Sequence, residues 1–139
     1  MGQGYDALTR GLNLNQPGAA ESQIAELLEE SGVKFPSAYL DLLRFTNGAE
    51  GFIDSENYII IFRIEDLIEY NEGYGIPEFA PGCFLFASDG GGSAYLFDTG
   101  AAGMPIVGIP FDSLMERPVR LAGSLPEFLY DLVRIREIW

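Results

Sequence analysis

The sequence predicts a single α+β domain in which helices cover one side of an antiparallel sheet. Apolar residues recur at helical spacing in four segments, short β-branched or aromatic runs lie between them, and a glycine-rich turn joins two of these runs. With 139 residues and 47% hydrophobic content, the chain can bury roughly two thirds of its unfolded surface. We therefore expect one domain over residues 20–139, preceded by a flexible lead-in over residues 1–19 that is rich in Gly, Asn and Gln.

The first helix is predicted from Ala20 to Ser31, where apolar residues recur at i, i+3 and i+4, and Gly32 is expected to end it. Its inward residues are Ile24, Leu27 and Leu28, and Glu26, Glu29 and Glu30 face water.

The second helix is predicted to open at Phe35-Pro36, because proline is favoured in a first helical turn. Asn47-Gly48 is expected to end it in a left-handed cap. One face carries Tyr39, Leu42, Leu43 and Thr46.

The run from Tyr58 to Phe62 is bulky and largely β-branched, which predicts a buried strand. A third helix follows and ends at Gly73. Its inward residues are Ile64, Leu67 and Ile68, and its outward residues are Glu65, Asp66, Glu69 and Glu72.

Three further strands are predicted over 84–88, 94–98 and 104–109 as an antiparallel meander. Asp89-Gly90-Gly91-Gly92 supplies a tight reversal between the first two. Ser124 and Glu127 match a capping box that opens a closing helix, with Leu125, Phe128, Leu129 and Leu132 toward the sheet.

The charge is concentrated in the middle of the chain, whose formal net charge is −13. Between Arg44 and Arg117 the only basic residue is Arg63. Such a field attracts basic partners and repels polyanions, so we expect neither nucleic acid nor an anionic membrane as partner. The twelve acids of this segment are Glu50, Asp54, Glu56, Glu65, Asp66, Glu69, Glu72, Glu78, Asp89, Asp98, Asp112 and Glu116.

The chain has no histidine, which excludes His-based catalytic triads and ordinary zinc sites. Its one cysteine, Cys83, precedes an apolar run and is expected to be a buried hydrophobe. No apolar run reaches the roughly 20 residues needed to span a bilayer, and the first residues lack an export signal. We expect a cytoplasmic protein with no cofactor and no metal.

Two motifs have enzymatic or ligand-binding interpretations. Asp89-Gly90-Gly91-Gly92-Ser93 could cradle phosphate, but no Lys follows and strand residues come next, which favours a hairpin turn. The spacing of Asp89 and Asp98 does not match a calcium loop. Asp98-Thr99-Gly100 resembles the active-site turn of aspartic proteases, so a homodimeric protease is an alternative function.

The acidic segment has an ordinary interpretation, since charges on outward positions usually form a solvated face. Our hypothesis is that it binds a basic protein, with exposed aromatic residues as anchors. The loop from Asn71 to Gly82 is long enough to suggest a functional role. The predicted contact residues are Glu50, Asp54, Glu56, Glu65, Asp66, Glu69, Tyr70, Glu72, Tyr74, Glu78 and Phe79.

Three blocks resemble the SUKH superfamily over about residues 20–135. The first is Phe35-Pro36 followed by Tyr39, Leu42-Leu43 and Asn47-Gly48. The second is Phe86-Ala87-Ser88-Asp89-Gly90-Gly91-Gly92 followed by Phe97-Asp98, and the third is the segment from Ala122 to Leu129. Ala87 stands where Gly is common in the family, and Ala49-Glu50 follows Asn47-Gly48 where another Gly is frequent.

The resemblance implies a non-catalytic α+β domain. In bacteria such domains are immunity proteins that neutralise a cognate polymorphic toxin, often a nuclease, and fungal relatives act in regulation of cell-wall assembly. The matched motif residues are explained as turn, cap and packing residues, so they indicate the fold. These structural residues are Pro36, Tyr39, Asn47, Gly48, Ser88, Asp89, Gly90, Gly91, Gly92, Phe97 and Asp98.

Overall fold

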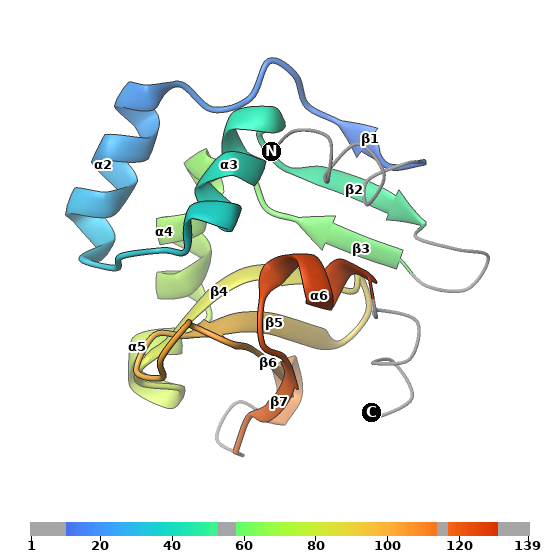
Figure 1. Cartoon of the computed structure of the whole chain (residues 1–139). Helices are drawn as coiled ribbons and strands as arrows, with labels where there is room; N and C mark the ends of the chain where they lie inside the picture. The colour runs from blue at the N-terminus through green and yellow to red at the C-terminus, as the bar shows by residue number, and fades with distance from the viewer. Residues whose placement is uncertain (1–10, 53–57, 114–116, 131–139) are drawn as a thin grey trace.

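The computed structural model describes residues 11–52, 58–113 and 117–130 (Figure 1). In these ranges seven strands form one sheet in the order β1-β2-β3-β4-β5-β6-β7, and each strand pairs antiparallel with its neighbour in the chain. This meander confirms the predicted fold class. The strands are β1 (Asn13–Leu14), β2 (Ala49–Phe52), β3 (Tyr58–Ile61), β4 (Cys83–Ser88), β5 (Ser93–Asp98), β6 (Ile106–Pro110) and β7 (Val119–Ala122).

The four predicted helices are present, the closing one as far as Tyr130, because Leu132 and the residues after it lie outside the described residues. Gly32 follows α2 with a φ of 68°, the left-handed conformation expected of a glycine stop. The Ser124 hydroxyl accepts a hydrogen bond from the Glu127 N–H at 3.3 Å, as the capping motif predicts. None of the helices in the described ranges is long and apolar enough to cross a membrane. The helices are α2 (Glu21–Ser31), α3 (Ser37–Phe45), α4 (Ile64–Gly73), α5 (Ile76–Phe79) and α6 (Leu125–Tyr130), with a 3₁₀ turn at Phe111–Ser113.

The end of α3 differs from the prediction of a left-handed cap at Asn47-Gly48. The helix ends at Phe45, and Thr46 is already extended, with a φ of −151°. The Thr46 hydroxyl donates to the Gly48 carbonyl at 2.7 Å and accepts from the Asn15 N–H at 2.8 Å, so side-chain bonds hold the chain extended there. Gly48, with a φ of 82°, forms the turn into β2. A Cβ at Gly48 would lie 2.9 Å from the Ile61 carbonyl oxygen.

The strands that the sequence analysis did not predict are short. β1 has two residues and lies in the segment expected to be a lead-in, where it pairs with β2. β2 has the sequence Ala-Glu-Gly-Phe, without a β-branched residue. These strands, together with β7, are defined by pairing with a neighbour, which local sequence does not reveal.

The core lies between the sheet and the two helices α3 and α6, which cover the same side of it (Figure 1). The ring centre of Tyr39 in α3 lies 4.9 Å from that of Phe97, and the ring centre of Phe128 in α6 lies 4.8 Å from that of Tyr95. Phe86 stacks on Phe97 at 4.4 Å. All five rings are fully buried. Aromatic contacts from both helices therefore anchor the central strands.

Helix α4 lies beside the part of β4 that is not paired with β3. β3 pairs with β4 only at Ile60–Ser88 and Ile61–Ala87. Farther along β4, the buried Asn71 side chain of α4 accepts a hydrogen bond from the Leu85 N–H at 2.8 Å and donates to the Leu85 carbonyl at 3.0 Å. One amide thus satisfies both backbone groups of Leu85 and places α4 against the sheet.

Replacing Asn71 with Ala tests this contact. The variant would leave the buried N–H and C=O of Leu85 without the Asn71 amide, so we expect a loss of about 2–4 kcal/mol in the free energy of unfolding. Urea denaturation measures it. Asn13→Ala changes an exposed amide and should stay within about 0.5 kcal/mol of the wild type. Equal stability of the two variants would contradict the assigned role of Asn71.

Candidate functional site

Helix α4 presents different side chains to its two sides. Its inward residues Ile64, Leu67 and Asn71 are buried. Glu65, Glu69 and Glu72 lie on one flank, and Asp66, Tyr70 and Tyr74 follow at intervals of four residues on the other. The helix therefore forms a ridge with a groove on each side.

The first groove lies between α2 and α4 and has a volume of about 350 Å³; we call it the glutamate groove. Leu27 and Ile64 are buried beneath it and Ile68 is half-buried, so its floor is apolar. No Lys or Arg is among the residues that line it. These residues are Gln23, Glu26, Leu27, Glu30, Ile64, Glu65, Ile68, Glu69 and Glu72.

Glu65 has a defined place in this groove. The Asn47 side-chain NH₂ group donates to Glu65 Oε1 at 2.7 Å, and Asn47 Oδ1 accepts from the Ile64 N–H at 2.7 Å. Hydrogen bonds from Asn47 and from its own backbone N–H, together with the nearby Arg63 charge, hold the pKa of Glu65 below its usual value. Glu65 therefore stays ionised to lower pH than an isolated glutamate.

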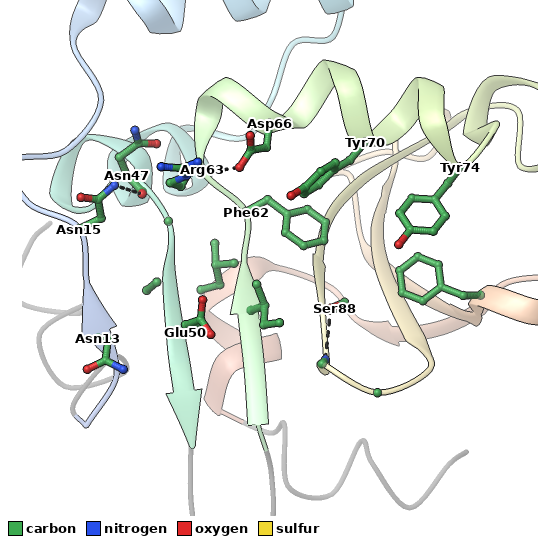
Figure 2. A pocket seen from close by; sticks show the side chains of 17 residues that line it. Asn13, Asn15, Asn47, Glu50, Phe62, Arg63, Asp66, Tyr70, Tyr74 and Ser88 are labelled. Carbon is green, nitrogen blue, oxygen red and sulfur yellow. Dashed lines mark hydrogen bonds and ion pairs between the residues drawn. The ribbon is translucent and has the colours of Figure 1, made fainter.

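The second groove lies on the face of β2 and β3 away from the core and has a volume of about 770 Å³; we call it the sheet-face groove (Figure 2). Ile59 and Ile61 of β3 are buried in the core, whereas Ile60 is only half-buried, and the alternation of a strand assigns its side chain to the opposite face. The lining residues are Asn13, Asn15, Asn47, Gly48, Ala49, Glu50, Ile60, Ile61, Phe62, Arg63, Asp66, Tyr70, Tyr74, Ser88, Gly90, Gly91 and Phe111.

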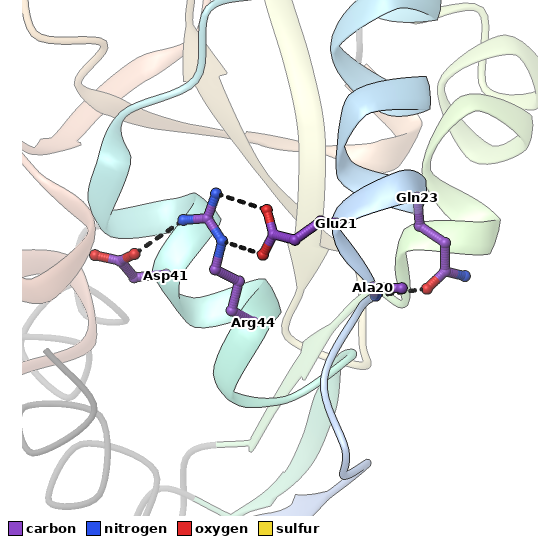
Figure 3. Close-up of polar contacts among 5 residues, drawn as sticks. All are labelled: Ala20, Glu21, Gln23, Asp41 and Arg44. Carbon is purple, nitrogen blue, oxygen red and sulfur yellow. Dashed lines mark hydrogen bonds and ion pairs between the residues drawn. The ribbon is translucent and has the colours of Figure 1, made fainter.

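Arg44 lines neither groove, although it lies next to the acidic segment in sequence. Its guanidinium binds both carboxylate oxygens of Glu21, at 2.8 and 3.2 Å, and Asp41 at 3.1 Å (Figure 3). This cation therefore links the start of α2 to the end of α3.

The structure divides the predicted contact residues between the two grooves. Glu65, Glu69 and Glu72 line the glutamate groove. Glu78 and Phe79 are exposed on α5 and line neither groove, and Asp54 and Glu56 lie outside the described residues. The remaining four, Glu50, Asp66, Tyr70 and Tyr74, line the sheet-face groove.

The sequence hypothesis did not include Glu26 and Glu30, because it took the acidic segment to begin after Arg44. Both glutamates lie on the outward face predicted for the first helix, which was the signal available. Their proximity to the α4 glutamates follows from the packing of α2 on α4 around Leu27 and Ile64. That packing is a tertiary contact.

The glycine-rich motif is a hairpin turn between β4 and β5, as predicted. Asp89 Oδ1 accepts hydrogen bonds from the Gly91 N–H at 2.8 Å and the Ser93 N–H at 3.0 Å, so the turn's own carboxylate occupies the position an anion would take. Asp98 closes the next turn, accepting from the Gly100 N–H at 3.1 Å. The described residues contain no group of three or more His, Cys, Asp or Glu side chains placed to hold a metal ion.

Cys83 is half-buried at the start of β4. Burial, and to a smaller extent the Asp98 carboxylate, raise the pKa of its thiol to about 11. The thiol is therefore protonated at neutral pH and weakly nucleophilic.

This pKa predicts slow alkylation of Cys83. At pH 7.5 we expect iodoacetamide to react roughly 10–100-fold more slowly with the folded chain than with the same chain in urea, because less thiolate is present. The folded-state rate should keep rising with pH beyond 9. Because the chain has one cysteine, mass spectrometry reports this site alone. Equal rates for the folded and unfolded chains would contradict the prediction.

A seven-stranded meander covered by α3 and α6, with α4 set beside β4, defines a small α+β domain. The chain belongs to the SMI1/KNR4 family (SUKH-1), whose family model matches residues 18–131. Domains of this family are generally non-catalytic and serve in immunity or regulation. A search of curated proteins finds no match to the sequence.

Proposed function

We propose that this protein is an immunity-type binding domain that neutralises a cognate toxin with a basic surface. The observation that carries the proposal is the glutamate groove, where five carboxylates surround an apolar floor with no basic residue in the lining. Family membership supports a binding role without catalysis. Nuclease toxins fit this surface, because their clefts are basic in order to hold phosphate groups. Such a protein would act in the cytoplasm.

The charge arrangement explains how binding would proceed. Carboxylates at five points around one groove raise the encounter rate of a basic protein and orient it. Ile68, which is half-buried in the floor, offers apolar contact once the partner has docked. The charges therefore set the rate and specificity of association, and burial of apolar surface adds affinity.

A regulatory protein-interaction module is the second candidate, and the family match favours it equally, since the family includes regulatory domains. Gene neighbourhood separates the two functions. A toxin gene directly upstream, whose product is neutralised in co-expression, supports immunity. A host protein captured through the same groove supports regulation.

The triple variant Glu26→Gln, Glu69→Gln, Glu72→Gln tests the glutamate groove and leaves Glu65 bound to Asn47. With the neighbouring gene product as partner, we expect the association rate constant at low ionic strength to fall about tenfold, because the attractive field is weakened. Stopped-flow or surface-plasmon measurements give the rate, and rising salt should reduce the difference between variant and wild type.

The matched control is Glu29→Gln, Glu78→Gln, Glu127→Gln, which removes three exposed charges outside both grooves. Its association rate should fall less than twofold. If both triple variants slow association equally, only the net charge matters and the groove assignment is wrong. If neither changes binding, the proposed docking face is wrong.

A further inference from the structure

The floor of the sheet-face groove is a row of side chains that crosses four strands. Asn13 pairs with Glu50, Glu50 with Ile60, and Ile60 with Ser88. Directly opposed residues in antiparallel strands lie on the same face, so these four form a continuous line. Three strand spacings give it a length of about 14 Å, which corresponds to about four residues of extended chain.

One wall of this groove consists of aromatic rings that are already held in place. Tyr74 stacks on Phe111 with ring centres 4.5 Å apart, and Tyr70 packs edge-on to Phe62 at 4.9 Å (Figure 2). Tyr74 remains 44% exposed. Rings fixed by neighbours lose little conformational freedom on binding, which makes them effective anchors.

The floor of the sheet-face groove is negatively charged. The lining contains two carboxylates and one guanidinium, and Arg63 pairs with Asp66 at 3.3 Å. The other carboxylate, Glu50, accepts a hydrogen bond from the Tyr58 hydroxyl at 2.7 Å, which holds it in the middle of the floor row. A cationic side chain is the complement of this position.

A glycine in the β4–β5 turn allows the turn to approach the floor. Gly90 has a φ of 78°, and a Cβ there would lie 3.0 Å from the Tyr58 ring and 3.6 Å from Ile60. The turn therefore packs close to β3, and Gly90 and Gly91 line the groove on the β4 side.

We propose that the sheet-face groove binds an extended segment of a protein partner, with one Lys or Arg over Glu50 and apolar side chains against Ile60 and the Tyr74–Phe111 pair. The groove is about as long as four extended residues. Its Glu50 carboxylate complements a cationic side chain, and its apolar and aromatic side chains complement apolar residues on either side of that cation. A partner that crosses the α4 ridge reaches both grooves at once. The inference rests on the proposed function only in that the partner is a protein, and it applies equally to a toxin or a regulatory target.

Selection from a phage-displayed library of random heptapeptides against the whole protein tests the proposal. We expect enriched peptides to carry a basic residue flanked by apolar ones. Tyr74→Ala and Glu50→Gln should each weaken binding of the best synthetic peptide at least fivefold. The matched controls are Phe79→Ala, an aromatic residue 41% exposed on α5, and Glu78→Gln, and both should stay within twofold of the wild type. Unchanged circular dichroism and melting temperature show that the variants are folded.

Enrichment of acidic peptides, or of none, would overturn the proposal. So would peptides that lose binding in the glutamate-groove triple variant but bind normally to Tyr74→Ala and Glu50→Gln. A concentration-dependent dimer that Tyr74→Ala dissociates would assign the groove to a second copy of the chain and would also overturn it. Normal partner binding by the triple variant refutes the glutamate groove alone and leaves this inference standing.

Discussion

The start of α4 is held in place by one buried amide, that of Asn47. Its carbonyl oxygen accepts a hydrogen bond from the N–H of Ile64, the first residue of α4, and its NH₂ group donates to Glu65. The Asn47 backbone N–H donates to the Asn15 backbone carbonyl, and the Asn47 backbone carbonyl accepts from the Asn15 side-chain NH₂ group. One residue thus connects the segment after β1, the turn before β2 and the start of α4. Because both grooves share α4 as a wall, both depend on this contact.

A second asparagine holds the same helix farther along. Asn71 pairs with the backbone of Leu85 where β3 no longer accompanies β4. Both amides are buried and hydrogen-bonded, whereas the glutamates of α4 are exposed. Neutral polar groups can satisfy backbone partners inside the fold without the desolvation cost of a charge, so the charged residues remain on the surface, where a partner can reach them.

The sequence predicted the elements whose signal is local. Helical spacing in α2, α3 and α4 and the Asp89–Gly92 reversal were readable because the pattern lies within one segment. β1, β2 and β7 were missed, since their short sequences become strands only through pairing. The prediction of a left-handed helix cap at Asn47-Gly48 was wrong because hydrogen bonds of the Thr46 hydroxyl with Asn15 and Gly48 hold the chain extended. Asn15 lies 31 positions away from Thr46, so local sequence does not reveal this contact.

By itself the sequence determined the α+β class, the absence of histidine chemistry and the strongly acidic character, because composition and local periodicity express these directly. Only the tertiary structure decided how the acids are distributed. Packing of α2 on α4 adds Glu26 and Glu30 to three predicted glutamates, and strand register places Glu50 in a different groove. The physical reason is that a binding surface consists of residues brought together by long-range packing, which the order of residues along the chain does not specify.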